Sequence, residues 1–315
     1  MRRTARVARG RVWRDLVLGR RARQALAGVA ALALLTAYAV LIEPNRVRPT
    51  RYALWTPGLP PTLDGVRIAH LTDFHVGTRG APMTALRRGV ALAAAWRPDL
   101  VVLTGDFVDD GRWRPEAALF TVLAAIAPVY AVLGNHDHWG LPGDVDDIVA
   151  GLHANGVTTL ANTHAIVQLP ARGDVTLVGV DDPSLEQDDL GAALCGLPAL
   201  TDPDRPTLLL AHAPEIAERA PADRFAAILC GHTHGGQVRL SPFHHRTPLE
   251  ISMIVGGIAS PYPRGIHHVR GNPLLVNRGL GVAGLPLRFL APPEVALITL
   301  RRAPASAASR LEHLD

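Results

Sequence analysis

Eight polar residues that could bind metal ions or act on a substrate occur along the chain, each directly after a short apolar run. They are two aspartates, one asparagine and five histidines: Asp73, His75, Asp106, Asn135, His136, His212, His232 and His234. Carboxylate oxygen combined with imidazole nitrogen suits Mn, Fe, Zn and similar divalent ions, whereas Ca and Mg sites are almost all oxygen. The set is too large for one tetrahedral ion but large enough for two, and two neighbouring ions need a bridging carboxylate. Asp106 lies in the central segment and is the natural bridge.

The residues between these clusters predict the elements that must position them. The apolar runs that end directly before the clusters are Val66–Leu71, Leu100–Leu103, Val129–Leu133, Leu208–Ala211 and Ala227–Cys230. Thr84–Trp96 and Pro115–Ala127 have Leu and Ala at helical spacing, and further strands are expected at Val175–Val180, Leu274–Val276 and Val295–Leu300. Strands that alternate with helices predict an α/β fold, in which ligands bind beyond the carboxyl ends of the strands. Every polar cluster lies at such an end, so the sequence predicts one shared site.

Each cluster alone is weak support for a metal site. A lone Asp-x-His pair usually arises by chance, and a lone Gly-Asn-His-Asp is more often a structural turn than a functional site. A lone Gly-His-Thr-His is at best as often a pair of metal ligands as not. Their joint occurrence at successive strand ends, in an order that can share one pocket, is what indicates function.

At these motifs the sequence resembles the calcineurin-like metallophosphoesterases over about residues 64–300. The five matching motifs occur in order: Asp73-x-His75, Gly105-Asp106-x-x-Asp109, Gly134-Asn135-His136-Asp137, a lone His212, and Gly231-His232-x-His234. The bacterial membrane-anchored branch is the most similar, through an extended run over Gly231–Gln237 and the later Gly279–Gly281, Pro286–Phe289 and Pro292–Glu294. The resemblance implies two packed mixed β-sheets flanked by helices and preceded by an N-terminal transmembrane helix.

The resemblance also implies a role for each motif residue. Asp73, His75, Asp106 and His234 would hold one ion, and Asp106, Asn135, His212 and His232 would hold the second. A water bridging the two ions would attack phosphorus. His136 would protonate the leaving oxygen, with Asp109 or a neighbour orienting it. Arg264 and Arg278 are candidate phosphate contacts, because arginine can grip phosphate bidentately.

Composition excludes several function classes. Hydrophobic residues make up 48% of the chain, which rules out a disordered protein, and the 2 cysteines rule out a disulfide scaffold. All 32 basic residues are arginine. Residues 1–24 hold nine of these and one acidic residue, whereas acidic residues outnumber arginine in the rest. The basic character therefore belongs to the N-terminus, and no nucleic-acid-binding surface is evident.

The N-terminus predicts a membrane association. Residues 25–42 are uncharged, about the shortest length that spans a bilayer core of roughly 30 Å. The arginine-rich residues 1–24 favour a cytoplasmic N-terminus and an extracytoplasmic catalytic domain on the inner membrane. The alternative is a signal peptide cleaved at Ala37-Tyr38-Ala39 and an exported domain. The expected order is therefore a basic segment (1–24), an anchor or signal (25–42), a linker (43–63), the catalytic domain (64–300) and a tail (301–315).

The function indicated is a metal-dependent phosphohydrolase that cleaves phosphodiester or phosphoanhydride bonds, with two divalent ions of Mn, Fe or Zn type. A narrower alternative is a hydrolase of a lipid-linked nucleotide-sugar pyrophosphate in envelope synthesis. The alternative from another class is a non-catalytic metal-binding scaffold. A degenerate scaffold is expected to have lost part of the ligand set, and no member of the set is missing from this sequence.

Overall fold

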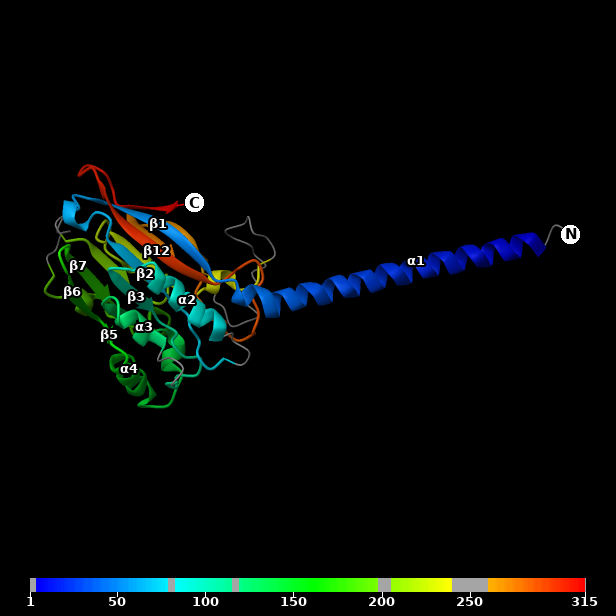
Figure 1. The fold of residues 1–315 in the computed structure, drawn as a ribbon, viewed down its shortest axis with the longest axis horizontal. Coiled ribbons are helices and arrows are strands. Elements are labelled where there is room, and N and C mark those ends of the chain that lie inside the picture. Colours follow the sequence, from blue (N-terminus) through cyan, green and yellow to red (C-terminus); the bar gives the residue numbers. More distant parts are fainter. Residues whose placement is uncertain (1–3, 79–82, 115–118, 198–204, 240–259, 315) are drawn as a thin grey trace.

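The computed structural model describes residues 4–78, 83–114, 119–197, 205–239 and 260–314, with side chains from residue 19 onward. Two β-sheets form the body, and a long N-terminal helix projects from one end (Figure 1). The helices are α1 (Thr4–Ala37), α2 (Met83–Ala95), α3 (Thr121–Ala124), α4 (Asp144–Ala154), α5 (Leu190–Leu194) and α6 (Ile216–Arg219). Short helical turns also occur at Tyr38–Ile42, Glu43–Asn45, Pro61–Leu63, Asn135–His138, Pro183–Leu185 and His234–Gly236.

The first sheet has the strand order β13-β1-β12-β2-β3-β4-β5. Its strands are β1 (Arg48–Pro57), β2 (Arg67–Leu71), β3 (Leu100–Thr104), β4 (Val129–Val132), β5 (Val157–Thr159), β12 (Glu294–Ala303) and β13 (Arg310–Leu314). Strands β2 to β5 are parallel to one another, β12 is antiparallel to β2, and β13 is antiparallel to β1. The sheet is therefore mixed, as expected.

The second sheet has the order β10-β11-β9-β8-β7-β6 and is also mixed. Its strands are β6 (Thr163–Leu169), β7 (Gly173–Gly179), β8 (Thr207–Leu210), β9 (Ala227–Cys230), β10 (Gly265–Val269) and β11 (Asn272–Val276). Leu210 and Leu229 from this sheet share one buried cluster with Ile68 and Val102 from the first sheet. Since both faces of the central strands are covered, these strands are continuous apolar runs, which is the pattern found in their sequences.

Helices cover the outer faces of the two sheets. Leu86 and Val90 of α2 and Ile148 of α4 pack in one cluster with the outer face of the first sheet. Ile216 and Ala217 of α6 pack against the second sheet. The predicted fold class and all the predicted strands are thus confirmed, and the first predicted helix matches α2.

Two predicted boundaries are wrong. Residues 43–63 were expected to be a linker, but they contain β1, which pairs with β12 over ten residues from Arg48 opposite Glu294 to Pro57 opposite Ala303. Residues 301–315 were expected to be a tail, but β12 extends to Ala303 and β13 adds an edge strand. These segments contain Pro, Arg and small residues, and β1 has only the four-residue apolar run Tyr52–Trp55, so pairing with distant residues extends the strands beyond what the local sequence indicates. The second predicted helix begins at residues outside the described part of the chain, and its described residues include a 3₁₀ turn at 119–120 and α3.

The C-terminal strand gives a stability prediction. Leu311→Ala is expected to lower the free energy of unfolding by about 2–4 kcal/mol, because Leu311 is buried between the sheets and its loss leaves a cavity. Leu314→Ala is the matched control, since Leu314 lies on the same strand with a 39% exposed side chain. Urea denaturation of the two purified variants measures the difference. Two equally small effects would mean that residues 301–315 act as a tail after all.

The N-terminal helix is long and apolar enough to cross a membrane, by length and composition. The span Gly19–Asn45 is 27 residues long with a mean hydropathy of 2.3, and none of it is buried inside the protein over its most apolar window. It comprises the end of α1 and the turns Tyr38–Ile42 and Glu43–Asn45. The body begins immediately afterwards, because β1 starts at Arg48.

The foot of this helix, defined as residues 38–45, is bonded to the body. Ala39 O accepts a hydrogen bond from the Arg288 backbone (2.9 Å), and the buried Glu43 carboxylate accepts one from the Ala291 backbone (2.6 Å). The ring of Tyr38 packs edge-on against Phe289, with 6.4 Å between ring centroids. The C-terminal end of the candidate span is therefore fixed to one particular surface of the body.

Strand directions locate the functional end of the body. β1 runs away from the foot, β12 is parallel to β1, and β2 returns in the opposite direction with His70 opposite Ala296. The carboxyl ends of β2, β3 and β4 therefore lie at the end of the body from which the N-terminal helix emerges (Figure 1).

Candidate metal centre

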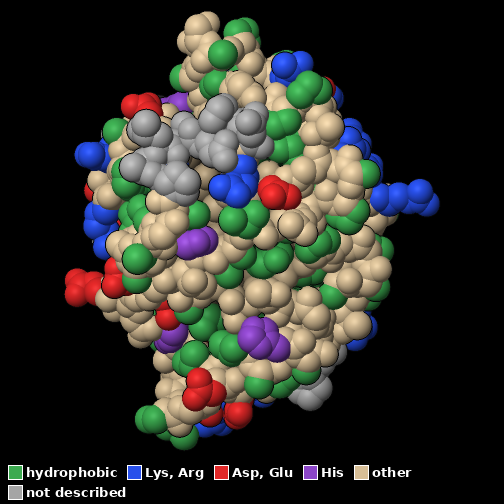
Figure 2. Space-filling model, turned by 90° about the vertical axis from the view of Figure 1, so that its left-hand side faces the viewer, with side chains coloured by type: hydrophobic (Ala, Val, Ile, Leu, Met, Phe, Trp, Pro, Cys, Tyr) green, Lys and Arg blue, Asp and Glu red, His purple; other side chains and the backbone are tan. Residues whose placement is uncertain are grey.

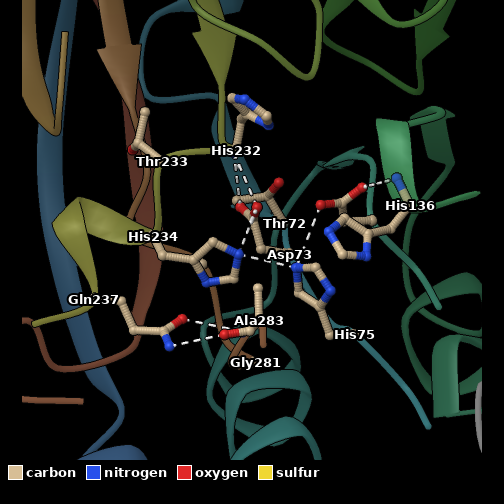
Figure 3. Close-up of polar contacts among 12 residues, drawn as sticks. Thr72, Asp73, His75, His136, His232, Thr233, His234, Gln237, Gly281 and Ala283 are labelled. Carbon is tan, nitrogen blue, oxygen red and sulfur yellow. Dashed lines mark hydrogen bonds and ion pairs between the residues drawn. The ribbon is translucent and has the colours of Figure 1, made fainter. Parts of the chain in front are cut away.

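Four buried residues form the first group of possible metal ligands: Asp73, His75, Asp106 and His234. Nε2 of His75 lies 2.9 Å from Nε2 of His234 and 3.3 Å from Oδ2 of Asp106. Nε2 of His234 lies 3.4 Å from Oδ1 of Asp73. Figure 3 shows these imidazoles meeting beside Asp73, although they come from loops that follow β2 and β9.

A second group contains Asp106, His212 and His232. Nε2 of His212 lies 3.1 Å from Oδ2 of Asp106 and 3.1 Å from Nδ1 of His232. Asp106 therefore belongs to both groups, in the position expected of a bridging carboxylate. Asn135 follows β4, and its side-chain oxygen is buried without a hydrogen-bond partner in the protein. An unpartnered buried oxygen is costly, and a cation beside it would satisfy it.

The backbone of the ligand loops is held in an uncommon conformation. Five of the candidate ligand residues have positive φ angles between 48° and 71°: Asp73, His75, Asp106, His232 and His234. Non-glycine residues rarely adopt this left-handed region, and such strain concentrates at functional sites. Gly105, with φ of 88°, precedes the bridging aspartate, and a Cβ there would lie 2.6 Å from the Gly134 nitrogen. The two motifs pack so closely that only glycine fits.

Backbone donors hold the carboxylates in place. Asp73 accepts from the His232 amide (2.9 Å), and Asp106 Oδ1 accepts from the His136 amide (2.9 Å). The fully buried Asp137 accepts from the amides of Phe107 (2.8 Å) and Gly134 (2.9 Å), so it ties the loops after β3 and β4 together. Sequence analysis gave Asp137 no role, although it lies within the Gly-Asn-His-Asp motif.

The charges in this centre call for cations. Burial opposes ionisation of Asp106, but His212 and His75 hold the pKa of its carboxyl well below the usual value. Burial likewise opposes protonation of His75, yet Asp106 raises its pKa to about 9, and the pKa of His212 is also well above its ordinary value. Burial and the charge of His212 lower the pKa of His232 to about 3. Protons on two imidazoles thus balance the carboxylates, and divalent ions that bind here would displace them. The donor set fits Mn, Fe or Zn.

His136 lies beside the centre on the turn after β4. Its Nδ1 donates to the backbone oxygen of Asp109 (2.8 Å), and the ring of Trp139 lies 3.6 Å from its own ring, centroid to centroid. Burial lowers the pKa of His136 below its ordinary value. The Asp109 carboxylate lies closer to Nδ1 of His75 (3.2 Å) than to Nδ1 of His136 (3.5 Å). Asp109 therefore orients His136 through its carbonyl and the ligand His75 through its carboxylate.

The two arginines expected at the substrate have different surroundings. Nε of Arg278 donates to the buried carboxylate of Glu294 (3.0 Å), which also accepts from the hydroxyl of Tyr52 (2.8 Å). Arg264 is half-buried on the segment before β10. The neighbouring Pro263 carbonyl accepts from Thr233, inside the His232–His234 loop.

The face turned away from the N-terminal helix carries mixed charge. Figure 2 shows Arg and acidic side chains interspersed over this face. This agrees with the expectation from composition, which placed the excess of arginine at the N-terminus.

Comparisons with known proteins agree with this geometry. A profile of the calcineurin-like phosphoesterase family matches residues 66–236. The chain is 30% identical over 284 residues to the uncharacterized metallophosphoesterase YkuE of Bacillus subtilis, covering 87% of this chain and 94% of that protein. It is 31% identical over 243 residues to the phosphodiesterase YaeI of Escherichia coli, covering 74% of this chain and 82% of that protein. It is 28% identical over 311 residues to a Danio rerio transmembrane protein with a metallophosphoesterase domain, covering 94% of this chain and 67% of that protein. The motif residues, their convergence at the strand ends and these similarities together show that the chain belongs to the calcineurin-like phosphoesterase family and is a metal-dependent phosphoesterase.

Proposed function

We propose that this protein is a membrane-anchored phosphohydrolase that uses two divalent ions to cleave phosphodiester or phosphoanhydride bonds in a substrate at the bilayer surface. The observation that carries the proposal is the shared position of Asp106. It contacts His75 of one ligand group and His212 of the other, both through Oδ2. A carboxylate that serves two groups of nitrogen donors is what a pair of neighbouring ions requires.

Each part of the chain has a distinct task in this reaction. Two bound ions would supply a nucleophile from water at neutral pH and would neutralise charge on the phosphoryl oxygens. Asp73, His75, Asp106 and His234 would hold one ion, and Asp106, Asn135, His212 and His232 would hold the other. His136 gives a proton to the leaving oxygen. Its Nδ1 is held by the Asp109 carbonyl, which leaves Nε2 as the nitrogen that carries that proton. Arg264 and Arg278 are proposed contacts for the substrate phosphate.

The direction of the strands supports a substrate at the membrane. The ligand loops follow the carboxyl ends of β2, β3 and β4, at the same end of the body as residues 38–45. An anchored enzyme with this arrangement presents its catalytic centre toward the bilayer that holds it. A phosphate or pyrophosphate attached to a lipid would therefore reach the centre without leaving the membrane surface.

A substrate panel tests this function. The full chain, purified in detergent with Mn²⁺ added, is expected to hydrolyse phosphodiesters or pyrophosphates. Substrates of the same headgroup with a lipid chain, presented in mixed micelles, are expected to be cleaved faster than their water-soluble counterparts. Equal rates on both forms would remove the lipid-linked alternative. No hydrolysis of any phosphoester, in a protein that binds Mn²⁺, would favour the non-catalytic scaffold instead.

Contacts of the foot favour a retained anchor over a cleaved signal. Cleavage after Ala39 would remove the carbonyl that accepts from Arg288 and the ring of Tyr38 that packs on Phe289. Both contacts belong to the folded catalytic body, so the mature protein gains stability by keeping these residues.

The charge of the N-terminus predicts the orientation. A reporter that is active only outside the cytoplasm, fused after Asp315, is expected to work, because nine arginines precede the apolar span. Replacing most of these arginines with glutamine is expected to produce a mixed orientation. Protease added outside an intact inner membrane is expected to digest the domain. A protected domain together with a silent reporter would place the catalytic body in the cytoplasm.

A further inference from the structure

A fully buried arginine lies directly behind the metal centre. Arg288 has no exposed surface, and the side chains with which it bonds in the described structure include no carboxylate. Sequence analysis quoted it only as part of the Pro286–Phe289 run. Because burying a cation is costly, an arginine in this position must be compensated by many hydrogen bonds.

The guanidinium of Arg288 holds the loop that packs against Asp73. It donates to the carbonyls of Arg278 (2.9 Å) and Gly281 (2.9 Å from Nε). The amide of Gly281 in turn donates to the carbonyl of Asp73 (2.6 Å). Gly279, with φ of 69°, lies so close that a Cβ there would be 2.5 Å from the Asp73 Cβ. The position of Asp73 therefore depends on the loop that Arg288 fixes, and Gly281 lies beneath Asp73 and His234 in Figure 3.

The same guanidinium contacts His234 at two points. Nη1 donates to the His234 carbonyl (3.3 Å), and Nη2 donates to Nδ1 of the imidazole (3.3 Å). Because arginine can only donate, Nδ1 is the acceptor in this contact, and the guanidinium fixes the orientation of the imidazole ring. The other ring nitrogen, Nε2, faces Asp73 and His75.

Arg288 is itself held from the other side. Its backbone amide donates to Ala39 in the foot of the N-terminal helix, and Ala291, whose carbonyl accepts from Nη1 (2.9 Å), donates its amide to Glu43. The segment that carries the guanidinium is thus anchored to the foot while the guanidinium reaches the ligands.

From these contacts we infer that Arg288 is a positioning residue that sets the affinity of the first ion by orienting His234 and the loop beneath Asp73. The inference rests on the proposed function, in which these residues bind an ion. Outer partners of metal ligands typically change affinity by about 10–100-fold when they are replaced. Arg288 is fully buried and bonds to His234 and the loop beneath Asp73, so it acts through the ligands.

The test uses Mn²⁺ as the probe and the full chain in detergent. Two variants are made: Arg288→Lys keeps the charge but loses the planar fork of donors, and Arg288→Met keeps the volume without a buried charge. Chelator competition is expected to show about 10–100-fold weaker binding of one Mn²⁺ in each variant, with the second ion retained. At Mn²⁺ concentrations that fill the stronger site but not the weakened one, each variant is expected to bind about one ion per chain. The thermal stabilisation that Mn²⁺ gives is expected to shrink in parallel.

A matched control separates positioning from general stability. Asn272 is also fully buried, and it bonds the backbone amides of Arg224 and Phe225 (2.9 Å each) at the start of β11, away from the centre. Asn272→Ala is expected to lower the melting temperature and to leave Mn²⁺ affinity unchanged. A folded Arg288 variant that binds two Mn²⁺ with wild-type affinity would overturn the inference while the proposed function stands. A wild-type protein that binds no Mn²⁺ would overturn the proposed function and this inference with it.

Discussion

Replacing Asp106 with asparagine is expected to release bound metal and to reduce turnover by about 10³-fold or more, because charge stabilisation at a reacting centre has effects of this size. Asp106 Oδ2 lies within 3.3 Å of His75 and 3.1 Å of His212, so one substitution weakens both ligand groups. The side-chain amide of the variant presents a neutral oxygen to the two imidazoles, in place of the negative charge of the carboxylate. Metal content per chain and the rate on one phosphodiester, measured on the same preparation, give the result.

Asp182→Asn is the matched control for this variant. Asp182 is also a fully buried aspartate in the catalytic body, but it belongs to neither ligand group, and its Oδ2 accepts from Ser184 and the Leu185 amide. We expect it to keep its metal and most of its activity. An Asp106→Asn protein that is fully metallated and active would contradict the two-ion proposal, and equal losses in the two variants would mean that any buried carboxylate here has the same effect.

The centre could be predicted from the sequence because its residues follow directly on the strands that position them. In a sheet, the carboxyl ends of parallel strands lie at one edge, so Asp73 after β2, Asp106 after β3 and Asn135 after β4 are brought together by topology alone. The apolar runs that precede them are short and continuous, which is why these runs could be predicted as strands. In the second sheet, His212 after β8 and His232 after β9 follow the same rule.

The features that sequence analysis missed depend on residues far apart in the chain. β1 is stabilised by β12, whose residues lie more than 240 positions later, and its own sequence has only the short apolar run Tyr52–Trp55, flanked by arginine, proline and threonine. The carboxylate of Asp109 contacts His75 more closely than His136, and the backbone geometry that causes this has no counterpart in residue spacing. Arg288 resembles any surface arginine in the sequence, and only the packing shows that it is buried.

His136→Ala is expected to keep both metal ions and to lose about 10²–10⁴-fold in rate on substrates with alkyl leaving groups, which is the typical contribution of a general acid. The loss is expected to be much smaller on nitrophenyl esters, because nitrophenolate leaves without protonation. The structure adds a reason to test this role directly. His136 also lies within ligand distance of His75 and Asp109, a third group that could in principle hold an ion.

Metal analysis and the comparison of leaving groups decide between an acid and a ligand at this position. His138→Ala is the control, because His138 lies on the same turn and its Nε2 donates to the Asp181 carboxylate (2.8 Å) outside the ligand groups. It is expected to change the rate only slightly on either substrate. If His136 were a ligand, its variant would lose an ion and slow both substrates equally. If it is the acid, the ratio of the two rates changes while the metal content does not, because the proton it supplies matters only when the leaving oxygen is a strong base.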